Sequence, residues 1–208
     1  MRRAVVCAAF LSAVLVSSCA TTSGPVEVIL RPAPQQATRG QIVGEAIVTS
    51  LGGVMATVRW LDRAAIDAFY AARPGLTVPW PAGEWKENPP TIFLLRLQNQ
   101  TRDEVQFDPA LVSLMTQSGK RELPLPYEDM YMRLADTENA GPRLQSLQAT
   151  LFSRFVVLRP GAQRDGLLLF RALESDVKFV SLEVASFFVA GRSNPGRFDF
   201  QVLREPAK

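Results

Sequence analysis

Residues 91–99 have the sequence TIFLLRLQN, and this stretch decides the fold. Its middle is apolar at consecutive positions, so both faces of a strand built from it would be covered, as in the interior of a sandwich. Turn signals follow at intervals of about ten residues through the rest of the chain, which favours antiparallel strands over alternating βα units. We therefore predict a mainly β, antiparallel β-sandwich with short helical insertions.

Outward from this strand, the preceding segment predicts a hairpin and a helix. Ile42–Ser50 and Val54–Leu61 are β-rich runs on either side of Gly52-Gly53, a dipeptide typical of tight hairpin turns. Asp62 is a suitable cap for a helix over Arg63–Arg73. The apolar face of that helix would hold Ile66, Phe69 and Tyr70.

The segments that follow carry a resemblance to a known class of domain. They are TIFLLRLQN (91–99), VQF (105–107), LRPG (158–161), GLLLF (166–170) and FDF (198–200). In this order they resemble uncharacterised immunoglobulin-like domains of bacterial lipoproteins and secreted proteins. The resemblance implies an immunoglobulin-like β-sandwich over roughly 91–203 and brings no catalytic residues with it.

The N-terminus has the layout of an export signal. Arg2 and Arg3 precede an apolar run, Ala4–Val16, that would span about 20 Å as a helix, too short for a bilayer core of about 30 Å. Val16-Ser17-Ser18-Cys19 then resembles a bacterial lipobox. That resemblance implies cleavage before Cys19, a diacylglyceryl group on its sulfur and acylation of the new amine by a fatty acid such as palmitate.

This interpretation divides the chain into three parts. Residues 1–18 are the expected signal peptide, 19–40 a flexible tether with a possible edge strand at Val26–Leu30, and 41–205 the folded domain. Ala20 stands where an aspartate retains well-studied lipoproteins in the inner membrane, so we expect an outer-membrane protein facing the periplasm. Loss of Arg2 and Arg3 with the signal lowers the formal net charge from +3 to +1, which leaves no case for nucleic-acid binding.

Composition argues against an enzyme. The 208-residue chain has no histidine, and its two cysteines would be discarded (Cys7) or acylated (Cys19). The mature protein would therefore lack the commonest general base, thiolate chemistry and most zinc ligands. We expect no cofactor and no metal.

The candidate binding residues are aromatic. Trp80 and Trp85 lie in a proline-rich loop and are typical interface anchors, although they would also serve to cover the open end of the sandwich. Tyr127 and Tyr131 form a second candidate patch on a short helix, with a core position as the alternative. We expect a non-catalytic module that binds an envelope protein partner.

A second hypothesis is a peptidoglycan- or carbohydrate-binding protein or weak hydrolase. Glu84 and Glu87 flank Trp85, and glycoside hydrolysis needs two carboxyl groups across a sugar. Surface charge is the plainer explanation of this pair.

Overall fold

The computed structural model describes residues 26–35, 40–87 and 89–206, apart from the side chains of Glu87 and Ser186. The signal peptide, the lipobox and Cys19 lie outside the described residues. Within them the chain is mainly β, with two antiparallel sheets and a few short helices, so the predicted fold class is confirmed at this level.

One sheet contains seven strands and the other five in the described part of the chain. Along its main path the larger sheet has the order β1-β12-β11-β6-β9, and β7 and β8 extend it beside β11. Its strands are β1 (Val26–Pro32), β6 (Val105–Phe107), β7 (Val112–Thr116), β8 (Arg121–Glu122), β9 (Val156–Leu158), β11 (Phe179–Val189) and β12 (Arg192–Pro206).

The smaller sheet has the order β10-β5-β4-β3-β2. Its strands are β2 (Gln41–Val43), β3 (Ala46–Leu51), β4 (Val54–Leu61), β5 (Thr91–Asn99) and β10 (Gln163–Phe170). The predicted hairpin turn at Gly52-Gly53 joins β3 and β4, and both glycines have positive φ, 60° at Gly52 and 85° at Gly53, which a side chain would disfavour. The predicted single run Ile42–Ser50 is wrong, because a tight turn at Gly44, with a φ of 61°, divides it into β2 and β3.

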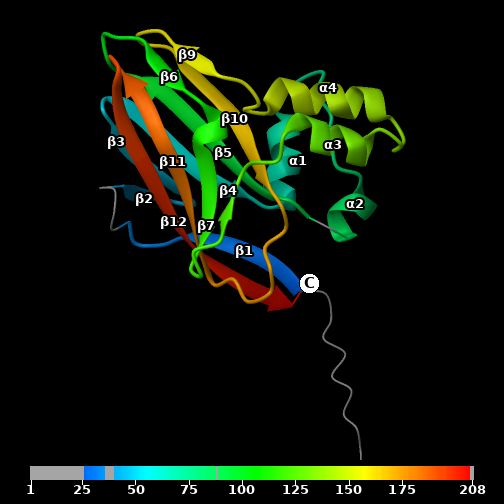
Figure 1. The fold of residues 1–208 in the computed structure, drawn as a ribbon. Helices are drawn as coiled ribbons and strands as arrows, with labels where there is room; N and C mark the ends of the chain where they lie inside the picture. The colour runs from blue at the N-terminus through cyan, green and yellow to red at the C-terminus, as the bar shows by residue number, and fades with distance from the viewer. Residues whose placement is uncertain (1–25, 36–39, 88, 207–208) are drawn as a thin grey trace, which may run out of the picture.

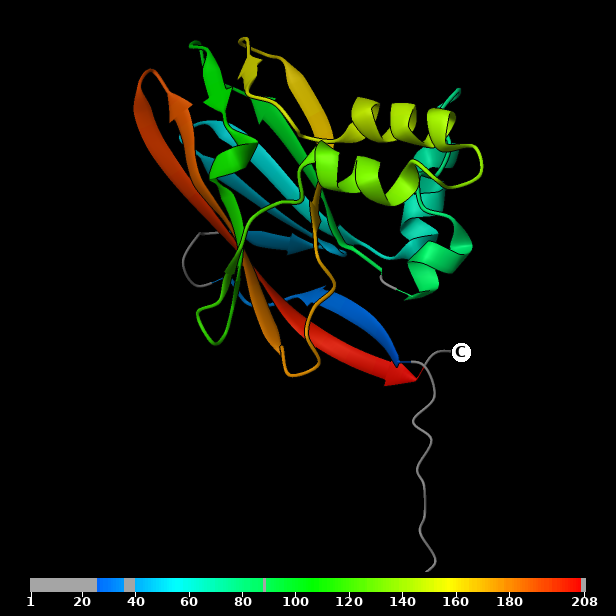
Figure 2. The ribbon, with the colours of Figure 1, turned by 45° about the vertical axis from the view of Figure 1, so that its right-hand side comes forward.

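The helices lie together on one side of the sandwich, as Figures 1 and 2 show. They are α1 (Arg63–Ala71), α2 (Ala82–Glu87), α3 (Tyr127–Leu134) and α4 (Ala140–Thr150), and a 3-10 turn, η1, spans Pro109–Leu111. Asp62 caps α1 as predicted, because its Oδ1 accepts the amide of Ala65 at 2.7 Å.

Strand β5 explains why the sandwich carries a helical layer. Phe93, Leu95 and Leu97 belong to the core between the two sheets, whereas Ile92 belongs to a second core under the helices. A strand that is apolar on both faces must be covered on both, because burial of apolar area is the main favourable term in folding. The doubly apolar pattern of residues 91–99 therefore has its explanation in two cores.

The folded part begins earlier than the predicted boundary at Gln41. Strand β1 pairs along its whole length with the last strand, β12, and Leu30 is buried in the sandwich core. Part of the segment predicted as a tether, residues 19–40, is therefore a strand: the expected edge strand is present and extends to Pro32. The immunoglobulin-like strand topology stays a prediction.

Candidate functional site

The predicted tryptophan loop joins α1 to β5 and crosses the helical layer. Trp80 is completely buried in the second core, and Trp85 is half-buried beside it, with ring centroids 5.8 Å apart in an edge-to-face arrangement. The guanidinium of Arg63 lies over the Trp85 ring at 5.3 Å. Trp80 is thus a core residue and not an exposed partner anchor, because covering its large apolar surface stabilises the protein's own helical layer.

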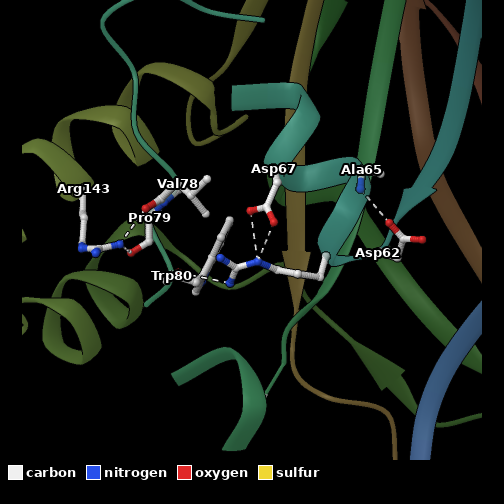
Figure 3. Close-up of polar contacts among 8 residues, drawn as sticks. Asp62, Ala65, Asp67, Val78, Pro79, Trp80 and Arg143 are labelled. Atoms are coloured by element: carbon white, nitrogen blue, oxygen red, sulfur yellow. Dashed lines mark hydrogen bonds and ion pairs between the residues drawn. The ribbon is translucent and has the colours of Figure 1, made fainter. Parts of the chain in front are cut away.

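Two arginines fix the backbone of this loop (Figure 3). Arg143 of α4 donates to the carbonyl oxygens of Val78 at 2.8 Å and Pro79 at 3.3 Å, and Arg63 of α1 donates to that of Trp80 at 3.3 Å. Asp67 in turn accepts from Arg63 at 3.0 Å. Because this stretch belongs to no sheet ladder, side-chain donors satisfy these three carbonyl groups.

A buried hydrogen bond joins α1 to α4. The Tyr70 hydroxyl lies 2.8 Å from Oγ1 of Thr150, whose own hydroxyl is 2.9 Å from the Ser146 carbonyl oxygen. Because that carbonyl only accepts, Thr150 donates to it and Tyr70 donates to Thr150. Burial raises the pKa of Tyr70 above its usual value, while the charge of Arg73 acts in the opposite direction.

The carboxylate beside the tryptophans is engaged in an ion pair. Glu84 of α2 accepts from Nε of Arg133 on α3 at 2.9 Å, and both side chains are largely covered. The side chain of Glu87 lies outside the described residues. The contact joins two helices of the layer and gives Glu84 a structural role.

The two predicted tyrosines lie on α3 and differ in exposure. Their ring centroids are 6.4 Å apart; Tyr127 is half-buried, and Tyr131 is 47% exposed. Met132, next to Tyr131, is 76% exposed. Of the four aromatic candidates, the structure therefore pairs the tryptophans in one place and the tyrosines in another.

Tyr127 also lines a hollow of about 450 Å³, which we call the Leu123 hollow. It lies between the segment before α3, the C-terminal end of α4 and η1. Its lining is mostly apolar and comprises Pro109, Ala110, Leu123, Pro124, Leu125, Pro126, Tyr127, Glu128, Gln148, Phe152, Ser153 and Arg154. Leu123 is 60% exposed and stands beside this mostly apolar lining, and contiguous exposed apolar surface of this kind is typical of a contact site.

A second hollow of about 350 Å³ adjoins the first. The two share Gln148, Phe152, Ser153 and Arg154, and the second adds Phe155, which is 54% exposed, and Arg164. In the described part of the chain, neither Arg154 nor Arg164 takes part in an ion pair. The surface therefore combines exposed apolar side chains with two cationic groups. One carboxylate, that of Glu128, also lines the first hollow.

Sequence reasoning did not find this surface. Its signal is the run Leu123-Pro124-Leu125-Pro126, in which proline removes every second amide donor and keeps the chain out of a sheet. Among the described residues, its one hydrogen bond to the rest of the protein is from the Leu125 amide to the Leu169 carbonyl oxygen of β10 at 2.7 Å.

Among the described residues, no group of three Asp, Glu, Cys or His side chains lies close enough to hold a metal ion. None of the helices in that same part of the chain has the length and apolar character to cross a bilayer.

Comparison with known proteins gives little further information. No family model and no curated protein matches the chain. Among solved structures it is similar to the yjhA protein from Bacillus subtilis, at 13% sequence identity over 69% of this chain and 78% of that chain, with a TM-score of 0.40. A similarity at this level carries no argument about function.

Proposed function

We propose that this chain is a lipid-anchored lipoprotein of the bacterial cell envelope, a non-catalytic module that binds an envelope protein partner. The anchor rests on the lipobox at 16–19, and Ala20 favours the outer membrane facing the periplasm. The binding role rests on one observation, the exposed apolar surface of the Leu123 hollow. An immunoglobulin-like sandwich is the proposed scaffold.

The partner that this surface fits is an apolar segment carrying acidic side chains. Leu123 and Phe155 offer apolar contact area, which supplies most of the favourable energy in such contacts. Arg154 and Arg164 stand beside them without an ion-pair partner in the described residues, so carboxylates on the incoming segment would be attracted. A basic segment would be repelled by the same two groups.

The partner is tested by co-purification from detergent-solubilised envelopes. Leu123→Asp places a carboxylate in the hollow, and Arg154→Glu reverses one rim charge, so each should reduce the recovered partner about tenfold or more. Ser193→Asp, on the β11–β12 hairpin, is the matched control and should leave recovery unchanged. Equal recovery with Leu123→Asp and Ser193→Asp would contradict this binding site.

The anchor is tested separately by labelling with radioactive palmitate. The natural chain should take up label and fractionate with membranes, because two or more acyl chains give stable attachment. Cys19→Ala should abolish the label, whereas Cys7→Ala should retain it. Label that persists in Cys19→Ala would refute lipidation at this residue.

A further inference from the structure

Strand β1 forms an edge of the larger sheet, and its pairing shows which backbone groups point outward. On the β11 side of β12, the Val202 amide donates to the carbonyl oxygen of Lys178. On the β1 side, the Ala33 amide donates to the carbonyl oxygen of Asp199. Along an antiparallel pair, every second residue directs both its amide and its carbonyl group to the neighbouring strand. In β1 these are the odd-numbered residues, including Ile29, which lies opposite Leu203 of β12. The amides and carbonyls of Val28 and Leu30 therefore point away from the sheet.

This edge differs from that of β10 in the other sheet. Leu125 donates to the Leu169 carbonyl oxygen of β10 at 2.7 Å, and Phe152 donates to that of Leu167 at 2.9 Å, so loops cover that edge. No described residue makes a hydrogen bond to the outward groups of Val28 or Leu30. Natural edges are usually protected by charged side chains, a proline, a bulge or a short strand. β1 carries Glu27, Arg31 and Pro32, but it pairs over seven residues without a register shift.

We infer that β1 is a dimerisation edge, where it pairs antiparallel with β1 of a second copy of this chain. The outward groups lie on even-numbered residues, so even residues must face even residues across the new pair. A register centred on Ile29 satisfies this condition, because Val28 of one copy then exchanges hydrogen bonds with Leu30 of the other.

Charge complementarity selects this register. With Ile29 at the centre, Glu27 of each copy stands opposite Arg31 of the second copy, which makes two opposite-charge pairs across the symmetry axis. Shifting the register by two residues in either direction keeps the hydrogen-bond parity and loses both pairs. The strand sequence VEVILRP is thus self-complementary in one arrangement.

Within a single copy of the chain, the charges along β1 and β12 are unbalanced, and this dimer would balance them. Within one copy Glu27 lies directly opposite Glu205 of β12, a like-charge pair, and Arg31 lies opposite the neutral Gln201. Arg31 reaches Glu205 at only 3.9 Å, with both side chains well exposed. Arg31 of a second copy beside Glu27 would offset the repulsion between the two glutamates.

The position of Pro32, at the end of β1, is compatible with a dimer in which only the residues before it pair with the second copy. Pro32 has an even number, so the amide it lacks would have pointed outward. It leaves the pairing of β1 with β12 intact, and it ends the run of outward donors after Leu30.

The test is a charge swap in the full chain, measured by sedimentation velocity in density-matched detergent. Glu27→Arg places like charges together at both ends of the new pair and should weaken the dimer about tenfold or more. The double variant Glu27→Arg/Arg31→Glu restores opposite charges and should return the dimer to near its original strength. Because Glu27→Arg replaces the Glu27/Glu205 repulsion by attraction, loss of fold does not explain the loss of dimer. A monomeric natural chain, or an unrescued double variant, would overturn the proposal.

Disulfide formation tests the register itself, in a Cys7→Ser/Cys19→Ser background that needs no lipid anchor. Facing Cα atoms at a non-hydrogen-bonded antiparallel position are about 4.5 Å apart, within disulfide range. Ile29→Cys should therefore cross-link to itself on mild oxidation. Glu27→Cys should not, because its two copies would be roughly 13 Å apart along the strands, but it should cross-link to Arg31→Cys when the two are mixed. Self-linking of Glu27→Cys in place of Ile29→Cys would refute this register.

Discussion

Two proline-rich segments of this molecule, the tryptophan loop at residues 79–90 and the Leu123–Pro126 segment, differ in how far they are buried. The first buries Trp80 and is held by the guanidinium groups of Arg63 and Arg143. The second leaves Leu123 exposed and, within the described part of the chain, is held by one backbone hydrogen bond at Leu125. The tryptophans thus lie in the segment that is held to the second core, and the exposed apolar side chain lies in the other. Side-chain donors from α1 and α4 hold the first segment, and none is found on the second among the described residues.

The largest effect should follow from removing the buried indole. Trp80→Ala deletes the largest side chain of the second core and should lower the free energy of unfolding by about 3–5 kcal/mol. Chemical denaturation measures this, with Met132→Ala as the exposed control. A change as small as that of the control would mean that the tryptophan loop does not belong to the core.

Loss of one arginine from the loop should have an intermediate effect. Arg143→Met keeps much of the apolar stem and removes the donors to Val78 and Pro79, so the free energy of unfolding should fall by about 2 kcal/mol. Arg102→Met, on an exposed turn, is the matched control. Equal stabilities of the two variants would show that the loop holds its conformation without the arginine.

A smaller and pH-dependent effect should follow from Tyr70→Phe. At neutral pH the variant should lose about 1 kcal/mol with the Thr150 hydrogen bond. Because the folded protein raises the pKa of Tyr70, its neutral form stabilises the fold below about pH 10, and this contribution is lost as the pH rises above that value, by about 1.4 kcal/mol per unit.

The unfolding free energies of the natural chain and Tyr70→Phe should therefore converge above pH 10, as denaturation at several pH values would show. Tyr131→Phe, which alters an exposed ring, controls for the other tyrosines. A constant difference between the natural chain and Tyr70→Phe at all pH values would contradict the raised pKa of Tyr70, and equal stability at neutral pH would contradict the buried hydrogen bond.

The smallest effect on stability should come from the Leu123–Pro126 segment. Leu123→Ser changes a mostly exposed side chain and should alter the free energy of unfolding by no more than about 0.5 kcal/mol. The same variant should reduce partner recovery, which separates binding from folding. A loss of several kcal/mol would place Leu123 with the tryptophans as a structural residue.

Much of the fold followed from local patterns in the sequence. The Gly52-Gly53 hairpin, the Asp62 cap and the doubly apolar strand at 91–99 are short-range signals, and each is found where expected. The pairing of β1 with β12 is different, because it joins opposite ends of the chain and no local pattern specifies its partner. The burial of Trp80 depends in the same way on α1 and α4, distant elements that cover the smaller sheet.

The candidate site was predicted only in part. Tyr127 lines the Leu123 hollow, so one of the four aromatic candidates lies at the proposed surface. Leu123, Phe155 and Arg154 come from separate segments that only the folded chain brings together. Hydrophobic periodicity could not indicate these residues, because it reports the buried face of a single helix or strand. Their exposure depends on how separate segments pack at the edge of the helical layer.

The proposed partner-binding role is tested most directly by site-specific photo-cross-linking in living cells. A photoreactive residue at position 123 should give one discrete adduct, weakened by Arg154→Glu, whereas the same residue at Lys86, exposed in the tryptophan loop, should give none. An adduct at position 86 with none at position 123 would contradict the account and return the binding role to the tryptophan loop.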